Sequence, residues 1–183
     1  MPYREGLDTR HAALNGFRVA NHILDHLISM KRLRVLVAAY ACNPFQGSEE
    51  GVGWGWVRAI AQYHEVWVLT AAFHRRDLEL ALSRRSERHR WIHIAYVEEK
   101  PWHYRPTPAW IKVENSIAKP IMNWAYRSWL IDAFRLGRQL RREIEFDLVH
   151  QLTYVGFRFP GHLWKLGIPF IWGPIGGLEN TPW

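Results

Sequence analysis

Residues 43–56, NPFQGSEEGVGWGW, combine four glycines with two adjacent carboxylates. They follow the short apolar run RVLVAAYAC and lead into VRAIAQYHEV, which has the composition of a helix. Glycines that open a helix after a strand let a phosphate approach the backbone, where free N–H groups and the helix dipole favour an anion. We therefore interpret Gly51, Gly53 and Gly55 as a phosphate or diphosphate cradle, and a plain glycine-rich turn is the alternative.

The same stretch restricts which ligands the cradle can bind. Glu49 and Glu50 repel phosphate, so we expect at least one of them to cap the helix or to bind sugar hydroxyls. The spacing G-x-x-x-G-x-G-x-G differs from the G-x-G-x-x-G of nicotinamide and flavin sites. Such sites also hold the ribose with an acidic residue at the end of the second strand. Here no acidic residue follows the second predicted strand before Asp77. Both departures argue against a dinucleotide site.

Five short apolar runs predict the strands that must position these residues. They are residues 34–39, 65–70, 91–97, 147–151 and 169–172.

Helical patterns separate these strands. Val52, Trp56 and Ile60 recur at i, i+4 and i+8 after the first strand, and RRDLELALSRRSER predicts a polar-faced helix after the second. Residues 121–143 predict a long helix, and a short one is expected near residues 161–165. The long helix has an inward stripe of Trp129, Ala133, Leu136 and Leu140 and an outward row of Arg135, Arg138 and Arg142.

Strands that alternate with helices predict βαβ units and a parallel sheet. The continuously apolar run RVLVAAYA is typical of a strand covered on both faces. We therefore predict a Rossmann-like, doubly wound α/β domain over residues 33–183, preceded by a leader segment, residues 1–32, with a helix at 17–30. In such sheets ligands bind beyond the carboxyl ends of the strands, where residues 43–56 are expected to lie.

Composition limits the compartment and the partners. The 183 residues carry a net charge of +7 and a single cysteine, Cys42, which excludes an internal disulfide and suits a reducing cytoplasm. No secretory signal is visible, and no apolar run approaches the ~20 residues that span a bilayer. We expect a cytoplasmic protein, either soluble or peripheral at the inner membrane.

Basic and aromatic stretches have several interpretations. Residues 75–90, 102–110 and 124–142 could form a peripheral membrane face, a solvated surface over core tryptophans, or a stacking surface for sugars. Nucleic-acid binding would rest on charge alone, because no recognition motif supports it. We therefore expect no nucleic-acid partner.

Three motifs in order, GSEEGVGW, DLVHQLTY and GPIGG, resemble one known family. Residues 34–177 are similar to the N-terminal half of bacterial retaining glycosyltransferases of group 1 (GT4-like, GT-B fold). The resemblance implies two Rossmann-like domains across a cleft, of which the N-terminal one holds a saccharide or lipid-linked acceptor. The other holds the nucleotide-sugar donor through an acidic pair, E-x7-E. The implied reaction is hexose transfer with retention, in polysaccharide or glycolipid biosynthesis, without a metal or other cofactor.

The resemblance also implies roles for single residues. Gly51 and Gly53 match a loop that approaches the donor diphosphate, and Gly176 and Gly177 match a loop that lines the cleft floor. Glu49 has a counterpart without an evident role. No E-x7-E follows Gly177, so we expect the donor-binding domain to be absent, the acceptor domain to be incomplete, and the chain to be inactive alone.

His150 is the candidate catalytic residue. The resemblance places it against the transferred sugar, and a neutral imidazole at this edge could donate a hydrogen bond to a hydroxyl or shuttle a proton. A histidine packed against backbone is the alternative. Thr153 and Tyr154 could line the acceptor pocket or simply pack. We see no metal-ligand spacing among the histidines and carboxylates.

Two functions remain open at this point. The first is the acceptor-side domain of a glycosyltransferase whose donor half is missing. The second is a non-catalytic subunit of a split glycosyltransferase, which presents the acceptor or attaches the enzyme to a membrane. An E-x7-E domain in a neighbouring reading frame would be the partner chain in that case.

Overall fold

The computed structural model describes residues 31–84, 87–98, 115–154, 156 and 160–175, with backbone only at 87–88 and 115–123. Contacts divide the chain into two units, Met1–Arg32 and Leu33–Trp183, and the fold below is that of the second. The predicted leader helix at residues 17–30 lies outside the described residues.

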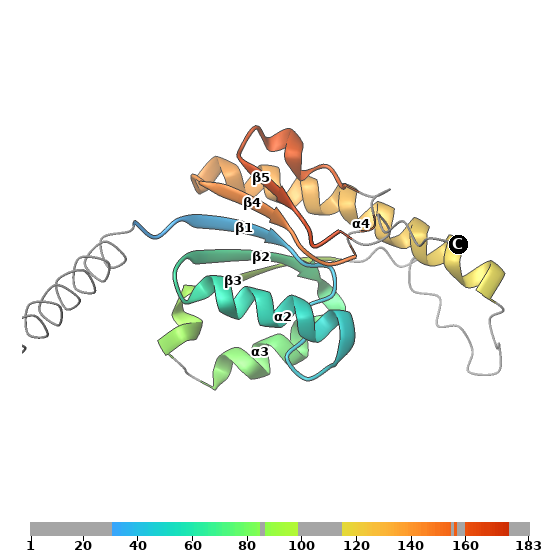
Figure 1. Ribbon diagram of the computed structural model, residues 1–183, viewed down its shortest axis with the longest axis horizontal. Coiled ribbons are helices and arrows are strands. Elements are labelled where there is room, and N and C mark those ends of the chain that lie inside the picture. The colour runs from blue at the N-terminus through green and yellow to red at the C-terminus, as the bar shows by residue number, and fades with distance from the viewer. Residues whose placement is uncertain (1–30, 85–86, 99–114, 155, 157–159, 176–183) are drawn as a thin grey trace, which may run out of the picture. The chain divides into compact units, whose positions relative to one another are not determined.

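A five-stranded parallel sheet forms the centre of this unit, in the order β3-β2-β1-β4-β5 (Figure 1). All five strands form where the apolar runs predict them, and the α/β, Rossmann-like fold class is confirmed. The strands are β1 (Arg34–Ala38), β2 (Glu65–Ala71), β3 (Ile92–Val97), β4 (Leu148–Gln151) and β5 (Phe170–Trp172).

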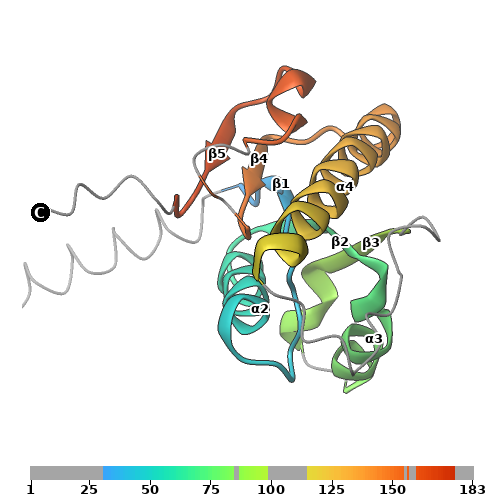
Figure 2. The same cartoon turned by 90° about the vertical axis from the view of Figure 1, so that its right-hand side faces the viewer.

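Helices cover both faces of the sheet, as a doubly wound fold requires (Figure 2). Helices α2 (Ser48–Ala61) and α3 (Arg75–Ser83) pack on one face. Helix α4 (Asn115–Glu143) and the 3-10 helix η3 (Leu163–Leu166) pack on the other. Two further 3-10 helices, η1 (Ala72–His74) and η2 (Glu87–Trp91), follow β2 and precede β3.

Alternation along β1 divides the core into two layers. Val35 and Val37 contact the α2 and α3 side, whereas Leu36 and Ala38 contact the α4 side. All four are at most 1% exposed, because a strand sends successive side chains to opposite faces and both faces are covered. This burial explains why the run is continuously apolar.

The predicted inward stripe of α4 is correct. Trp129 and Ala133 are buried, and Leu136 and Leu140 pack against the same core. The helix begins at Asn115, six residues before the predicted start.

The apolar stripe that revealed α2 is not its buried face. Val52 and Trp56 are about half exposed, at 48% and 44%. Trp54 and Val57 are buried instead, on the side where Gly53 meets the loop after β1. The predicted short helix near residues 161–165 forms a 3-10 turn slightly later, at Leu163–Leu166.

The strand order reverses between β1 and β4. The chain winds from β1 outward to β3, returns through α4, and continues from β4 to β5 on the other side. These two neighbouring strands therefore send their following segments to opposite faces of the sheet. Their carboxyl ends are the topological switch point, the place where such sheets commonly bind ligands.

Candidate functional site

Two segments distant in sequence meet at the switch point. The Tyr154 N–H donates to Glu49 Oε1 at 2.8 Å, which joins the segment after β4 to the start of α2. The Ala41 N–H donates to Thr153 Oγ1 at 3.1 Å, which joins the ends of β1 and β4. The structure therefore brings the predicted Glu49, Thr153 and Tyr154 together with the end of β4.

The N-terminal end of α2 differs from the predicted glycine cradle. The helix begins at Ser48, so the prediction that Gly51 and the following glycines open it is wrong. The amides without intrahelical partners are those of residues 47–50, and two of these residues are Glu49 and Glu50. The two carboxylates stabilise the positive end of the helix dipole and make this end anionic.

Gly53 has a packing role that the structure makes plain. A Cβ atom here would lie 2.1 Å from the Ala41 carbonyl oxygen and 3.0 Å from Thr153 Cγ2. Only glycine allows α2 to approach the end of β1 this closely. A contact of Gly51 and Gly53 with a diphosphate stays a prediction.

Thr153 is buried where α2, the loop after β1 and the segment after β4 meet. Its side chain is 1% exposed, and its carbonyl accepts a hydrogen bond from the Tyr126 hydroxyl at 3.3 Å. Of the two interpretations left open by the sequence, the geometry favours packing over lining an acceptor pocket.

Backbone strain is concentrated where the start of α2 meets the segment after β4. Ser48 and Tyr154 are the non-glycine residues with positive φ among the described residues, at +56° and +55°. Such conformations cost on the order of 1 kcal/mol each and persist where surrounding contacts enforce them. Tyr154 donates the hydrogen bond to Glu49, and Ser48 directly precedes Glu49, so this hydrogen bond supplies one such contact.

His150 lies at the end of β4 on the α2 side of the sheet, and it is 7% exposed. Its Nε2 lies 2.9 Å from the Gly173 carbonyl oxygen, and its ring meets Trp56 edge to face with centroids 5.9 Å apart. A carbonyl can only accept, so Nε2 carries the proton and Nδ1 is the accepting nitrogen. Burial lowers the pKa of His150 below its ordinary 6.5, and the Gly173 hydrogen bond opposes that effect.

A second polar network, which the sequence reasoning missed, lies at the carboxyl ends of β1 and β2. Asn43 Nδ2 donates to Asp77 Oδ2 at 2.7 Å and lies 3.3 Å from His74 Nδ1. Asn43 Oδ1 accepts the Phe45 N–H at 2.9 Å. The available signal was the position of Asn43 and His74, each a few residues beyond the end of one of two neighbouring strands.

His74 completes this network as a neutral ring. It is 1% exposed, and burial lowers its pKa, an effect that Glu50 and Asp77 oppose. Because Nδ1 accepts from Asn43, the proton is on Nε2, which has no hydrogen-bond partner among the described residues.

Aromatic rings cover the edge on the α4 side. Tyr40 lies at their centre and contacts each neighbour edge to face, with ring centroids 5.2 to 5.9 Å apart. The neighbours are Phe73, Tyr126, Trp129 and Tyr154.

Two predicted site residues, Gly176 and Gly177, lie outside the described residues. Within the part of the chain that the structure describes, no group of three or more His, Cys, Asp or Glu side chains could hold a metal ion. No helix in that part is long and apolar enough to cross a membrane.

Comparison with known proteins gives only a distant likeness. No protein-family model matches the chain, and neither does any curated protein. Among solved structures, the plant glycosyltransferase UGT73P12 of Glycyrrhiza uralensis, in complex with glycyrrhetinic acid 3-O-monoglucuronide, superposes with a TM-score of 0.49 and 16% identity. The superposition covers 76% of this chain and 27% of that one. A likeness this distant does not assign an activity.

Proposed function

We propose that the chain is the acceptor-side domain of a glycosyltransferase, which transfers a hexose from a nucleotide-sugar donor to a saccharide or lipid-linked acceptor. One observation supports this most. The motifs GSEEGVGW and DLVHQLTY, which the family resemblance singles out, meet at the switch point between β1 and β4 and are joined by the Glu49 to Tyr154 hydrogen bond.

The charge of this edge suits an acceptor better than a diphosphate. Glu49 and Glu50 occupy the first turn of α2, so the helix end that could attract phosphate carries two carboxylates. Carboxylates bind hydroxyl donors well and repel phosphate oxygens. We propose that the leaving diphosphate is neutralised by a second domain or a partner chain, and that the chain is inactive alone.

His150 has the chemistry to orient a sugar hydroxyl. Its Nε2–H donates to the Gly173 carbonyl, so the neutral ring offers Nδ1 as a hydrogen-bond acceptor. The sequence had suggested that His150 donates a hydrogen bond to the hydroxyl. We propose that Nδ1 accepts a hydrogen bond from a sugar hydroxyl. Trp56, half exposed and in contact with the His150 ring, offers an apolar face for the sugar ring.

An add-back assay tests the proposal. The extract comes from cells with an in-frame deletion of codons 33–183, so that a donor-binding domain in the same gene or in a partner chain is still made. It is supplied with radiolabelled UDP-, GDP- or ADP-hexoses and with the purified chain, and label in lipids and polysaccharides is counted. We expect the wild-type chain to restore transfer and His150→Ala to reduce it by roughly a hundredfold, the scale of a lost acid–base contact. His93→Ala, an exposed histidine on β3, is the matched control.

The outcomes separate the candidate functions. No restoration with any of the three nucleotide classes contradicts the proposal. Full restoration by His150→Ala favours the non-catalytic subunit instead. Transfer by the purified chain without extract would contradict the need for a second domain or chain.

A further inference from the structure

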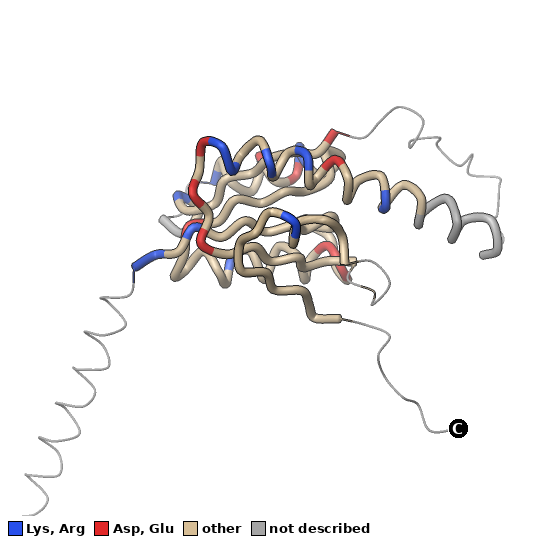
Figure 3. The backbone as a smooth tube through the Cα atoms, turned by 90° about the horizontal axis from the view of Figure 1, so that it is seen from above, with Lys and Arg blue, Asp and Glu red and all other residues tan. Residues whose placement is uncertain are grey.

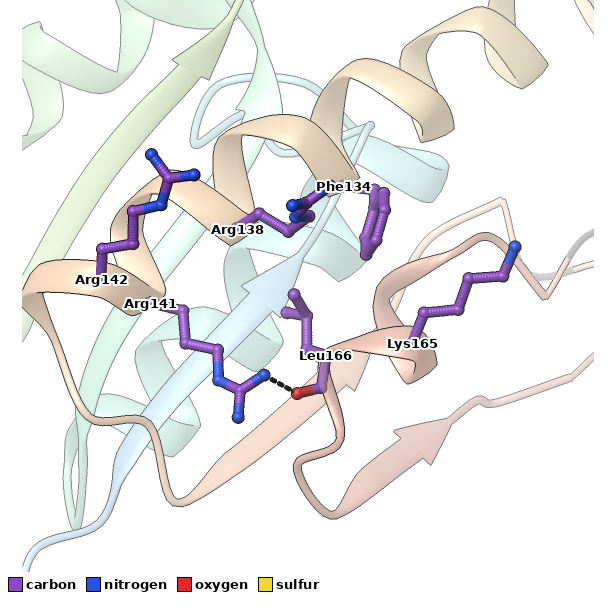
Figure 4. Close-up of a pocket in the computed structure, with 6 residues that line it drawn as sticks. All are labelled: Phe134, Arg138, Arg141, Arg142, Lys165 and Leu166. Carbon is purple, nitrogen blue, oxygen red and sulfur yellow. Dashed lines mark hydrogen bonds between the residues drawn. The ribbon is translucent and has the colours of Figure 1, made fainter.

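A cavity of about 420 Å³ lies between α4 and η3, well away from the candidate site (Figure 4). Its lining, here called the basic pocket, is Phe134, Arg138, Arg141, Arg142, Lys165 and Leu166. Helix α4 ends at Glu143 just before β4 begins, and η3 ends just before β5 begins. The pocket is therefore at the amino edge of the sheet, whereas His150 is at the carboxyl edge.

The basic pocket concentrates positive charge without compensation. Four of its six lining residues are Arg or Lys, and none is Asp or Glu. Basic residues recur along the C-terminal half of α4 (Figure 3). Among the described residues, no salt bridge joins any of the four cations to a carboxylate, whereas the neighbouring Arg135 pairs with Asp132 at 2.6 Å.

Three of the four cations contact groups other than acids. Arg141 donates to the Leu166 carbonyl, a contact that spans the pocket in Figure 4. Arg138 lies over the Phe134 ring at 5.8 Å, and Lys165 lies over the Trp164 ring at 5.4 Å. Stacking and backbone contacts orient a cation while leaving its charge available.

The helix dipole accounts for only part of this arrangement. Arg141 and Arg142 lie in the last turn of α4, where cations are stabilised by the helix carbonyls. Lys165 belongs to a different element and faces the same cavity. An adjoining cavity shares Arg141 and Arg142 but contains Glu143 and Glu145, so the acid-free pocket is the better anion site.

We propose that the basic pocket binds a phosphate-bearing anion, through charge-assisted hydrogen bonds from Arg138 and Lys165. Arginine forks and a lysine ammonium match phosphate oxygens in charge and geometry. A phospholipid headgroup and a free phosphate compound share this chemistry. This site does not depend on the proposed sugar transfer, because it uses no residue of the carboxyl edge.

Two probes distinguish the sources of phosphate. Pyrophosphate binding to the full chain is measured by isothermal titration calorimetry, and vesicle binding by co-sedimentation with phosphatidylglycerol in phosphatidylcholine and with phosphatidylcholine alone. The test variant is Arg138→Gln/Lys165→Gln. The control, Arg58→Gln/Arg76→Gln, removes the same charge from exposed positions on α2 and α3. All four positions are exposed. Circular dichroism is used to check that each variant is folded.

We expect the test variant to weaken binding roughly tenfold or more and the control to change it less than about twofold, because only the former removes direct contacts. Loss of pyrophosphate binding alone assigns the pocket to a free phosphate compound. Loss of binding to anionic vesicles, with or without pyrophosphate, assigns it to a headgroup. The proposal is overturned if the wild-type chain binds neither probe, or if the control loses as much as the test variant.

Discussion

Glu49 shows how a single side chain joins two parts of the candidate site. Its carboxylate accepts the Tyr154 N–H while it lies in the first turn of α2, so one group acts on both the helix dipole and the segment after β4. Glu50 lies in the same turn, and no hydrogen bond to its side chain is recorded among the described residues. Comparing substitutions of Glu49 and Glu50 therefore separates the energy of the Tyr154 hydrogen bond from the energy of the helix-dipole interaction.

Replacing Glu49 is expected to cost more stability than replacing its neighbour. Glu49→Ala removes the charged acceptor of the Tyr154 N–H, so we expect a loss of about 1.5 to 3 kcal/mol in the free energy of unfolding. Glu50→Ala removes only a first-turn charge, so the expected loss is about 0.3 to 1 kcal/mol. Urea denaturation at pH 7 measures both, and equal losses would mean that the Tyr154 contact contributes nothing.

Two buried histidines make stability dependent on pH. Burial lowers the folded-state pKa of His74 and His150 below the ordinary 6.5 of an unfolded chain. Between the two values the unfolded state binds more protons, so folding is most stable above about pH 6.5 and is weakened as the pH falls below it. We expect the urea midpoint to decrease from pH 7.5 to 5.5, and the decrease to be smaller in His150→Gln. An unchanged pH profile in that variant would show that His150 does not titrate as inferred.

At the scale of elements, the packing of α2 on the end of β1 depends on one glycine. A methyl group at position 53 would meet the Ala41 carbonyl at 2.1 Å, whereas at position 55 it would meet nothing within 4 Å. The two positions are two residues apart on one helix. The same substitution at both positions therefore separates the steric requirement for glycine from the effect of helix propensity.

Alanine substitutions at these positions are expected to have opposite signs. Gly53→Ala forces α2 away from the strand and should destabilise the protein by about 3 kcal/mol. Gly55→Ala should stabilise it by roughly 1 kcal/mol, because alanine favours a helix over glycine. Thermal unfolding of both variants measures this, and a tolerated Gly53→Ala would contradict the close approach seen here.

The elements were predictable from local patterns, whereas the contacts between them were not. Strand β1 is apolar on both faces and α4 has a clear stripe, so periodicity alone identified them. Periodicity did not identify the buried face of α2, which is formed by Gly53, Trp54, Val57 and Ala61, with Gly53 against the Ala41 carbonyl. The spacing of Val52 and Trp56 gives no information about the contact between Gly53 and the Ala41 carbonyl.

The composition of the site was predictable only in part. The rule that ligands bind beyond strand ends correctly placed residues 43–56 near His150. The partners of Glu49 and Asn43 depend on the strand order and on loop paths, and neither is encoded in local pattern. Sequence reasoning therefore found the edge but not its hydrogen bonds.

At the scale of the whole sheet, the two candidate sites lie at opposite edges and differ in charge. The site at the carboxyl edge includes Glu49 and Glu50 in the first turn of α2, whereas four of the six residues that line the basic pocket at the amino edge are Arg or Lys. A sugar with hydroxyl groups and a phosphate-bearing anion are therefore expected to bind at opposite ends of the strands.

Chemical-shift mapping tests the central claim, that the switch point between β1 and β4 binds the sugar substrate. The ¹⁵N-labelled chain is titrated with oligosaccharide acceptors and with nucleotide-hexoses, and Trp56→Ala is compared with Tyr63→Ala, an exposed aromatic beyond the end of α2. We expect a saccharide to shift the amides of Glu49 and Tyr154 and the His150 ring, and Trp56→Ala alone to weaken binding. Shifts confined to the amino edge, or no shift with any sugar, would contradict the claim.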